Sequence, residues 1–136
     1  MMRSVLLRPL AFALAVAWAA GITAYAHHSF GATYDTNKQV KLSGKLTQFV
    51  YRNPHSFVNI DVTDESGQLQ HWSLEWGGTA QLANAGVKRD SLKLGDDVRI
   101  VANPSRVPGE LRALMVNLTR PLDGFSWGRR PGEAVE

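Results

Sequence analysis

From Gln39 onward, apolar and polar residues alternate with a period of two, which restricts most of this chain to β-strands. In the long first strand, one face is expected to carry Val40, Leu42, Leu46 and Val50. Gly44 lies in the middle of this strand, where a glycine often marks a bulge or a bend. Asn53-Pro54 ends the strand, because proline lacks an N–H and disfavours the helical region for the preceding residue.

Four further strands follow, and turn residues separate them. They are expected over residues 56–63, 68–76, 98–102 and 111–118. Between the third and fourth strands, Thr79 is a candidate N-cap for a short helix over residues 80–85, which Gly86 stops. This order predicts a mainly β fold, a five-stranded OB-like Greek-key barrel with one short helix between strands 3 and 4. A small β-sandwich is the rival fold, but five strands are few for one.

Residues 1–26 have the three parts of a secretory signal peptide. Arg3 and Arg8 give a positive start, residues 10–20 are apolar, and Ala-Tyr-Ala at 24–26 supplies the small residues that a signal peptidase reads. The apolar segment is shorter than the roughly 20 residues that cross a membrane, so cleavage is expected rather than a membrane anchor. We therefore expect a periplasmic or secreted protein with no stable membrane span after cleavage.

Cleavage after Ala26 defines one domain over residues 27–120, which begins with an N-terminal arm. Residues 121–136 are rich in glycine, proline and charge, and a loosely ordered tail is expected there. The net charge of the precursor is +3, and the loss of Arg3 and Arg8 reduces it to about +1. Nucleic-acid-binding domains normally carry a basic patch, so no nucleic-acid partner is expected. The chain has no cysteine, which excludes a disulfide framework.

Cleavage at this position would make His27 the first residue of the mature chain. Its free α-amine, its imidazole and a second imidazole would give three nitrogens in a T-shape, called a histidine brace, which suits the tetragonal preference of Cu(II). An α-amine has an ordinary pKa of about 7.7, so its deprotonation for a metal costs little at neutral pH. His55 is the preferred second imidazole because a rigid proline turn precedes it. His71, on the polar face of the third strand, is the alternative.

His28 offers a second way to bind copper at the same terminus. The α-amine, the intervening amide nitrogen and the His28 imidazole can form a local chelate that needs no folded protein. A folded site requires His55, whereas local chelation does not. A third interpretation involves no metal, and the histidines are then polar residues of an arm and of a turn.

Glu75 and three aromatic residues support further hypotheses. Glu75 is a candidate acceptor that fixes the tautomer of a metal-bound histidine, and the simpler interpretation is a solvated strand carboxylate. OB barrels also bind ligands by aromatic stacking on a strand face. The residues expected to line such a face are Tyr51, Phe57 and Trp72. The chain has no cysteine nucleophile, and its small size indicates no substrate cleft, so a binding protein is favoured over an enzyme.

Several short motifs occur in a fixed order along the chain. They are His27-His28-Ser29-Phe30 followed by Tyr34-Asp35, then Asn53-Pro54-His55, Glu75-Trp76-Gly77, and Ser-Leu-Lys-Leu-Gly-Asp at residues 91–96. Together they resemble the domain-of-unknown-function family 6152 of small exported bacterial proteins, over about residues 26–122. The resemblance implies an exported β-barrel and draws attention to His27, His28, His55 and Glu75. It implies no function, so the copper hypothesis depends on chemistry alone.

The leading prediction is an exported copper-binding protein. It would use His27 and His55, with His28 as an auxiliary or competing ligand, for periplasmic copper handling or delivery. The alternative is a non-catalytic periplasmic binding or assembly module that recognises a glycan or an envelope protein on a strand face. The first predicts a tight metal site, and the second predicts an exposed aromatic cluster.

Overall fold

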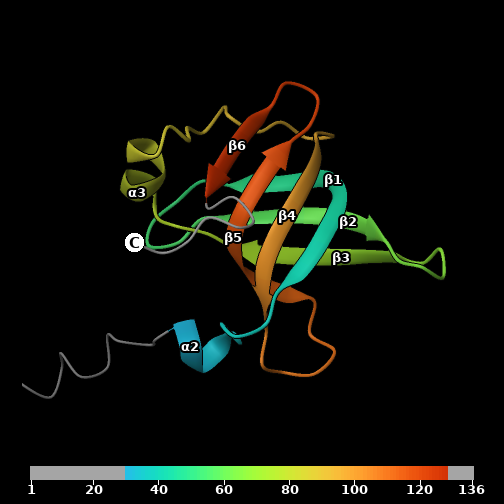
Figure 1. The fold of residues 1–136 in the computed structure, drawn as a ribbon. Helices are drawn as coiled ribbons and strands as arrows, with labels where there is room; N and C mark the ends of the chain where they lie inside the picture. Colours follow the sequence, from blue (N-terminus) through green and yellow to red (C-terminus); the bar gives the residue numbers. More distant parts are fainter. Residues whose placement is uncertain (1–29, 129–136) are drawn as a thin grey trace, which may run out of the picture.

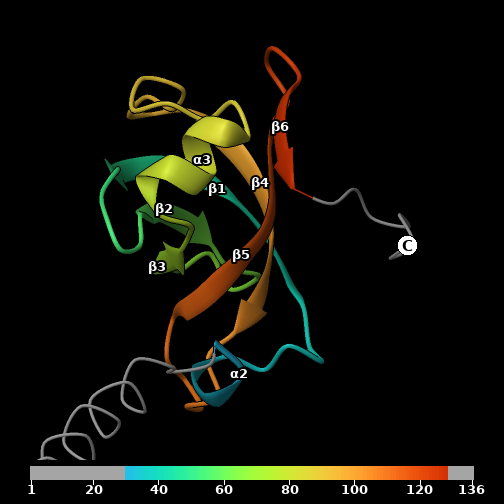
Figure 2. The same cartoon turned by 90° about the vertical axis from the view of Figure 1, so that its left-hand side faces the viewer.

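The barrel expected from the alternating sequence is present in the computed structural model, which describes residues 30–128 (Figures 1 and 2). Its strands are β1 (Val40–Val50), β2 (Phe57–Thr63), β3 (Leu69–Glu75), β4 (Asp97–Pro104), β5 (Arg112–Arg120) and β6 (Phe125–Gly128). Two short helices are α2 (Phe30–Thr33), before β1, and α3 (Thr79–Asn84), between β3 and β4. The predicted signal peptide lies outside the described residues. Within residues 30–128, no helix has the length and apolar character needed to cross a bilayer.

The barrel closes because β3, at one edge of the sheet, also pairs with β5. The sheet order is β3-β2-β1-β4-β5-β6, and the additional β3–β5 pairing is parallel. This pairing aligns Ser73 with Arg112 and Glu75 with Leu114, so the end of β3 meets the start of β5. In both views α2 and α3 lie at opposite ends of the barrel. The predicted OB-like topology, with one short helix between the third and fourth strands, is confirmed.

A β-bulge in β1 changes which side chains face the core. The register between β1 and β2 shifts after Leu46, where Thr47 is the extra residue. Because successive strand residues point to opposite faces, one extra residue inverts the alternation that follows. Phe49 therefore turns inward and packs against Trp76, with ring centroids 5.8 Å apart. The prediction that Val50 shares a face with Leu46 is wrong for this reason.

Gly44 lets two backbones approach each other closely. β1 pairs with β4 as far as Lys45 and with β2 from Lys45 onward, so the strand changes partner next to this glycine. A Cβ atom at position 44 would lie 2.3 Å from the main-chain oxygen of Asp61, a contact too short for any side chain. The glycine is therefore required by the close crossing of β1 and β2.

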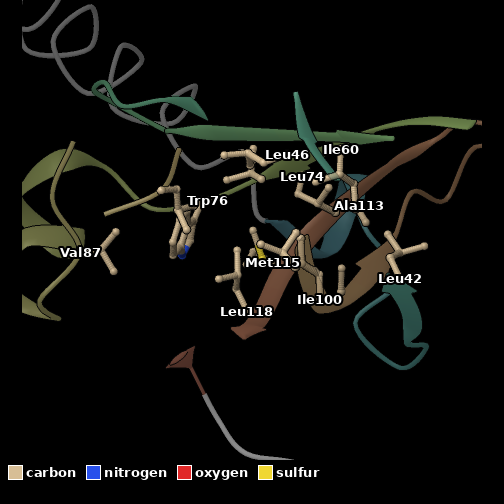
Figure 3. Close-up of a cluster of buried hydrophobic side chains, with 14 of the residues drawn as sticks. Leu42, Leu46, Ile60, Leu74, Trp76, Val87, Ile100, Ala113, Met115 and Leu118 are labelled. Carbon is tan, nitrogen blue, oxygen red and sulfur yellow. The ribbon is translucent and has the colours of Figure 1, made fainter. Parts of the chain in front are cut away.

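The hydrophobic core fills the inside of the barrel (Figure 3). The side chains with no exposed surface include Val58, Ile60, Leu74, Ala113 and Leu118 from the strands and Leu82 from α3. Trp76, directly after β3, is the largest buried side chain among the described residues and is 2% exposed. Burying such side chains supplies the main free energy that opposes the entropy cost of ordering the chain.

The strand β6, which follows β5, packs over Trp76. The sequence predicted a loosely ordered tail from Pro121, but Phe125–Gly128 form an antiparallel strand against β5. Trp127 packs edge-on against Trp76, with ring centroids 5.0 Å apart. Burial of this aromatic pair offsets the entropy cost of ordering the segment. The rest of the predicted tail, from residue 129, lies outside the described residues.

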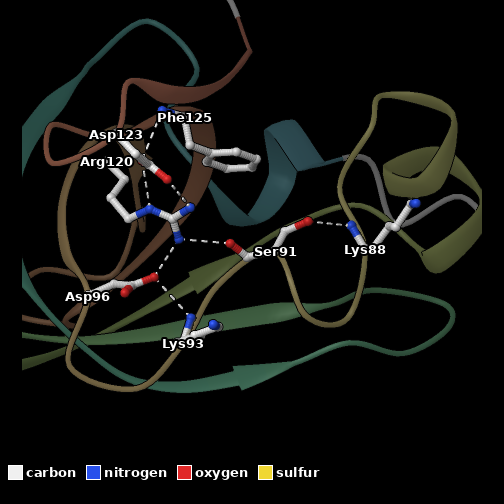
Figure 4. A network of polar contacts seen from close by, with 7 residues as sticks. All are labelled: Lys88, Ser91, Lys93, Asp96, Arg120, Asp123 and Phe125. Atoms are coloured by element: carbon white, nitrogen blue, oxygen red, sulfur yellow. Dashed lines mark hydrogen bonds and ion pairs between the residues drawn. The ribbon is translucent and has the colours of Figure 1, made fainter.

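Arg120, at the end of β5, joins two loops (Figure 4). Its guanidinium donates hydrogen bonds to Asp96 Oδ2 at 2.6 Å, to the Ser91 main-chain oxygen at 2.8 Å and to both carboxylate oxygens of Asp123. The hydrogen bonds from Arg120 lower the pKa of Asp123 to about 2. Burial alone would raise the pKa of Asp96, but the Lys93 N–H and the Arg120 guanidinium together lower it. This network ties the loop before β4 to the turn after β5.

The acid side of the stability profile tests the Arg120 network. The pKa values of Asp96 and Asp123 lie below the value of about 3.9 expected in an unfolded chain, so the folded protein binds fewer protons. Their contribution to the free energy of unfolding is present above about pH 4 and is lost as the pH falls toward about 2. Asp123→Asn should therefore lower stability at neutral pH and flatten this loss, as measured by urea unfolding across this pH range.

The matched control is Asp90→Asn, because Asp90 is exposed and makes no ion pair within the described part of the chain. This control should keep the acid dependence of the wild-type protein. The assigned role of Asp123 would be contradicted by an Asp123→Asn profile with the wild-type slope.

Gly44→Ala tests the close crossing of β1 and β2. The new methyl group must displace the backbone of β2, so the free energy of unfolding should fall by about 1–3 kcal/mol. Ser43→Ala, at the neighbouring exposed position, should change it by less than about 0.5 kcal/mol. Equal effects in urea unfolding would show that the close approach does not limit residue choice at position 44.

Candidate metal-binding site

The carboxylate of Glu75, at the end of β3, is where three distant parts of the chain meet. Glu75 is 9% exposed and lies on the strand face opposite to Leu74. It is contacted by Tyr34 from the N-terminal arm, His55 from the β1–β2 loop and Arg112 from the start of β5. A carboxylate is costly to bury unless its oxygens accept hydrogen bonds or face a positive charge. These three side chains meet both needs.

His55 has one ring nitrogen engaged and the other available. Its Nδ1 lies 2.7 Å from Glu75 Oε1, and its side chain is 39% exposed. A carboxylate oxygen only accepts hydrogen bonds, so the neutral imidazole donates its Nδ1–H and keeps its lone pair on Nε2. Nε2 has no hydrogen-bond partner among residues 30–128. Metal-binding histidines are commonly held in this way by a carboxylate.

The turn that carries His55 is fixed to the start of α3. Asn53 Oδ1 accepts hydrogen bonds from the Thr79 N–H at 2.9 Å and from the Thr79 hydroxyl at 3.0 Å. The predicted N-cap at Thr79 is therefore wrong: Gly78 occupies that position, and Asn53 satisfies the free N–H from outside the helix. A Cβ atom at Gly78 would lie 2.7 Å from the Pro54 main-chain oxygen. The Asn53-Pro54 peptide bond is cis.

Tyr34 connects the N-terminal arm to Glu75. α2 forms a single helical turn, in which the Tyr34 N–H donates to the Phe30 main-chain oxygen at 2.7 Å. Next to it, the Asp35 N–H donates to the Pro104 main-chain oxygen at 2.8 Å, and the Tyr34 side chain is 1% exposed. The Tyr34 hydroxyl donates to Glu75 Oε2. Burial, followed by the hydrogen bond to this carboxylate, raises the pKa of Tyr34, so the phenol stays a donor.

Arg112 supplies the positive charge beside Glu75. Its Nη2 lies 3.7 Å from Glu75 Oε2 and donates to the Tyr34 hydroxyl at 3.3 Å. The side chain is 42% exposed, so solvent partly screens its attraction to the carboxylate. No local motif in the sequence pointed to Arg112. The parallel pairing of β3 with β5 brings it to Glu75. A local signal existed for Tyr34, whose spacing from Phe30 placed both rings on one face of a helical turn.

The ring of Phe30, in the N-terminal arm, lies beside the ring of His55. The two rings are tilted by 43°, with centroids 5.2 Å apart, and Phe30 is 41% exposed. His27 and His28, the other predicted copper ligands, lie outside the described residues. Within residues 30–128, no group of three or more His, Asp or Glu side chains could hold a metal ion. A metal at His55 would therefore need further ligands from outside this range.

His71, the alternative histidine ligand, is separate from this cluster. Its Nδ1 lies 2.5 Å from Asp61 Oδ1 on the neighbouring strand, and its side chain is 77% exposed. It shares a face of β3 with Glu75 but lies four residues earlier, which is roughly 13 Å along a strand. The structure brings His55 and Glu75 together and leaves His71 apart.

The three aromatic residues expected on a ligand face lie in different settings. The Tyr51 hydroxyl donates to main-chain oxygens around α3, including that of Thr79 at 3.0 Å. Trp72 is half-buried and packs against the core. Phe57 lies under the exposed guanidinium of Arg52, which is 5.3 Å from the ring centroid. These three rings do not form one exposed cluster.

Residues 124–128 read Gly-Phe-Ser-Trp-Gly and match the Gly-x-Ser-x-Gly spacing of a hydrolase nucleophile turn. Such a turn joins a strand to a helix, but this segment enters β6, where Ser126 pairs with Thr119 of β5. Among residues 30–128, no hydrogen bond joins a histidine to Ser126. The match therefore lacks the geometry of a catalytic serine.

Two solved structures resemble the chain at low sequence identity. Both are crystal forms of the mitochondrial single-stranded DNA binding protein Rim1 from S. cerevisiae. The first is 12% identical, and the match covers 61% of this chain and 91% of the Rim1 chain, with a TM-score of 0.48. The second is 13% identical and covers 60% and 92%, with a TM-score of 0.44. No curated protein sequence matches the chain.

A comparison with protein families gives a broader match. The matched segment, residues 15–112, contains every side chain that surrounds Glu75, from Tyr34 through His55 to Arg112. It is 98 residues long and so spans more than half of the chain. The resemblance inferred from the short motifs is confirmed, and the chain belongs to the family of unknown function DUF6152.

Proposed function

We propose that this protein is exported, binds copper through His27 and His55, and serves periplasmic copper handling or delivery. The ligands would be the His27 α-amine, the His27 imidazole and Nε2 of His55, with His28 as an auxiliary or competing ligand. The observation that carries the proposal is the 2.7 Å contact between His55 Nδ1 and Glu75 Oε1, which leaves Nε2 with its lone pair. Such a carboxylate partner fixes the ring and raises the basicity of the nitrogen that binds a metal.

The position of Phe30 supports a ligand from the mature N-terminus. Its ring centroid lies 5.2 Å from that of His55, and Phe30 follows His27 by only three residues. Three Cα–Cα steps span at most about 11 Å, so an arm that starts beside His55 keeps His27 within reach. Cleavage after Ala26 would give His27 the free α-amine.

The available donors favour copper over zinc. Two imidazoles and one amine match the tetragonal preference of Cu(II), whereas structural zinc sites use four protein ligands in a tetrahedron. Glu75 is unavailable as a further ligand, because Tyr34, His55 and Arg112 already occupy its two oxygens. An ion on a side chain that is 39% exposed is accessible to a partner, which suits delivery.

Electron paramagnetic resonance during a Cu(II) titration tests the role of His55. The processed chain, residues 27–136, should bind one Cu(II) in a tetragonal nitrogen site. His55→Ala should change the spectrum and weaken binding by more than the roughly 10–100-fold that follows loss of an outer hydrogen-bond partner. His71→Ala is the matched control, because His71 also contacts a carboxylate but lies apart from Glu75. Identical spectra for the wild-type protein and His55→Ala would mean local chelation by His27 and His28.

A chain with one glycine added before His27 tests the terminal amine. The added residue moves the free α-amine away from the His27 imidazole and replaces it with an amide, so the brace should be lost. The new amine and the His28 imidazole can still chelate Cu(II) locally, so the copper spectrum of this chain should no longer change when His55→Ala is added. A spectrum that still depends on His55 would rule out His27 as a terminal ligand.

A non-catalytic binding module for a glycan or an envelope protein is the second candidate. The observation that favours it is the stacked pair of Arg52 and Phe57, 5.3 Å apart, which is partly exposed at the start of β2. Such a pair offers an aromatic face for packing and guanidinium N–H donors for hydrogen bonds to a partner. A processed chain without any tight copper site would favour this module.

A further inference from the structure

Tyr34 and Arg112 lie next to Glu75 but are not proposed copper ligands. Arg112 Nη2 donates to the Tyr34 hydroxyl at 3.3 Å, and this hydroxyl donates to Glu75 Oε2. On the other side of the carboxylate, Glu75 Oε1 lies 2.7 Å from His55 Nδ1. The four side chains form a continuous series of polar contacts from β5 through the arm to the β1–β2 loop.

We propose that Tyr34 and Arg112 are positioning residues that set the tautomer of His55. They hold Glu75 Oε2 on the side of the arm, so that Oε1 faces His55 and accepts its Nδ1–H. The proton on Nδ1 then leaves Nε2 as the nitrogen with a lone pair. The use of this nitrogen for copper depends on the proposed function, but the tautomer exists without any metal.

The rigidity of the arm explains why Tyr34 can hold the carboxylate. The Tyr34 ring is 1% exposed, and main-chain hydrogen bonds on both sides of it join the arm to the end of β4. These bonds run from Asp35 N to Pro104 O at 2.8 Å and from Arg106 N to Thr33 O at 2.9 Å. The hydroxyl position is thus fixed by the backbone. The arm that follows His27 in sequence therefore also determines which nitrogen of His55 is free.

Arg112 determines the direction of the hydrogen bonds in this series. A phenol can donate or accept, but a guanidinium only donates, so Arg112 occupies the acceptor side of the Tyr34 hydroxyl. The hydroxyl hydrogen is left to point at Glu75 Oε2. The Tyr34 hydroxyl and the Arg112 guanidinium are both donors beside Oε2. A glutamine side chain at position 75 would therefore place its oxygen next to them and turn its NH₂ group toward His55.

Glu75→Gln therefore has an expected result with a definite sign. The amide NH₂ should donate to His55 Nδ1, which moves the ring proton to Nε2. Long-range ¹H–¹⁵N correlation spectra of the metal-free processed chain at alkaline pH report the tautomer directly. The wild-type protein should show His55 protonated on Nδ1, and Glu75→Gln should show it protonated on Nε2. The affinity for Cu(II) should fall by at least about 10-fold in this variant.

Tyr34→Phe is the second variant and keeps the ring in place. Without the hydroxyl, the carboxylate is free to turn away from His55. The Nδ1–H then loses its fixed acceptor, and His55 should populate both tautomers. Tyr51→Phe is the matched control, because within residues 30–128 it removes a hydroxyl that bonds to main-chain oxygens around α3 and not to Glu75. That control should keep the wild-type tautomer. Thermal unfolding of Tyr34→Phe and Tyr51→Phe separates a loss of fold from a change in the tautomer of His55.

The results distinguish this inference from the copper proposal. Tautomer changes in Glu75→Gln and Tyr34→Phe without any tight copper site would support the positioning role and overturn the copper function. A copper site that requires His55, with the wild-type tautomer retained in both variants, would overturn the positioning role alone. A wild-type protein that is protonated on Nε2 would also overturn it.

Discussion

The parallel pairing of β3 with β5 is the contact on which the rest of the structure depends. It closes the sheet into a barrel and brings the end of β3 beside the start of β5, although these strands are far apart in sequence. Glu75 and Arg112 become neighbours only through this closure. The same closure leaves the outer side of Glu75 open, and the N-terminal arm and the β1–β2 loop cover it. The fold thus creates a partly enclosed carboxylate with partners from three directions.

Burial of that carboxylate links the arm to the barrel. Removing a charged oxygen from water is costly, and the cost is offset only if the donors around it stay in place. Tyr34 and His55 occupy one oxygen each, and Arg112 adds a partly screened positive charge. Displacing the arm would leave Glu75 Oε2 without its hydroxyl donor. The stability of the arm and the orientation of His55 are therefore coupled through one side chain.

Several residues of the short sequence motifs have structural roles in this protein. Asn53, Pro54 and Gly78 hold the β1–β2 loop against α3, and Asp96 anchors its loop to Arg120. These contacts account for Asn53, Pro54 and Asp96 without any ligand. The pair of His55 and Glu75 differs, because it orders a half-exposed imidazole whose second nitrogen has no hydrogen-bond partner within residues 30–128. Structural need alone does not explain why a histidine occupies that position.

The sequence by itself determined the first five strands, their order and the barrel, because alternation and turn residues are local signals that bury one face. It also singled out His55 and Glu75 by their positions after a proline turn and at the end of a strand. Tertiary structure decided three other matters: the bulge at Thr47 that turned Val50 outward, the strand around Trp127, and Arg112 beside Glu75. Each depends on a partner distant in sequence. A local pattern fixes which face of a segment is apolar, but strand register and barrel closure depend on the packing of the whole core.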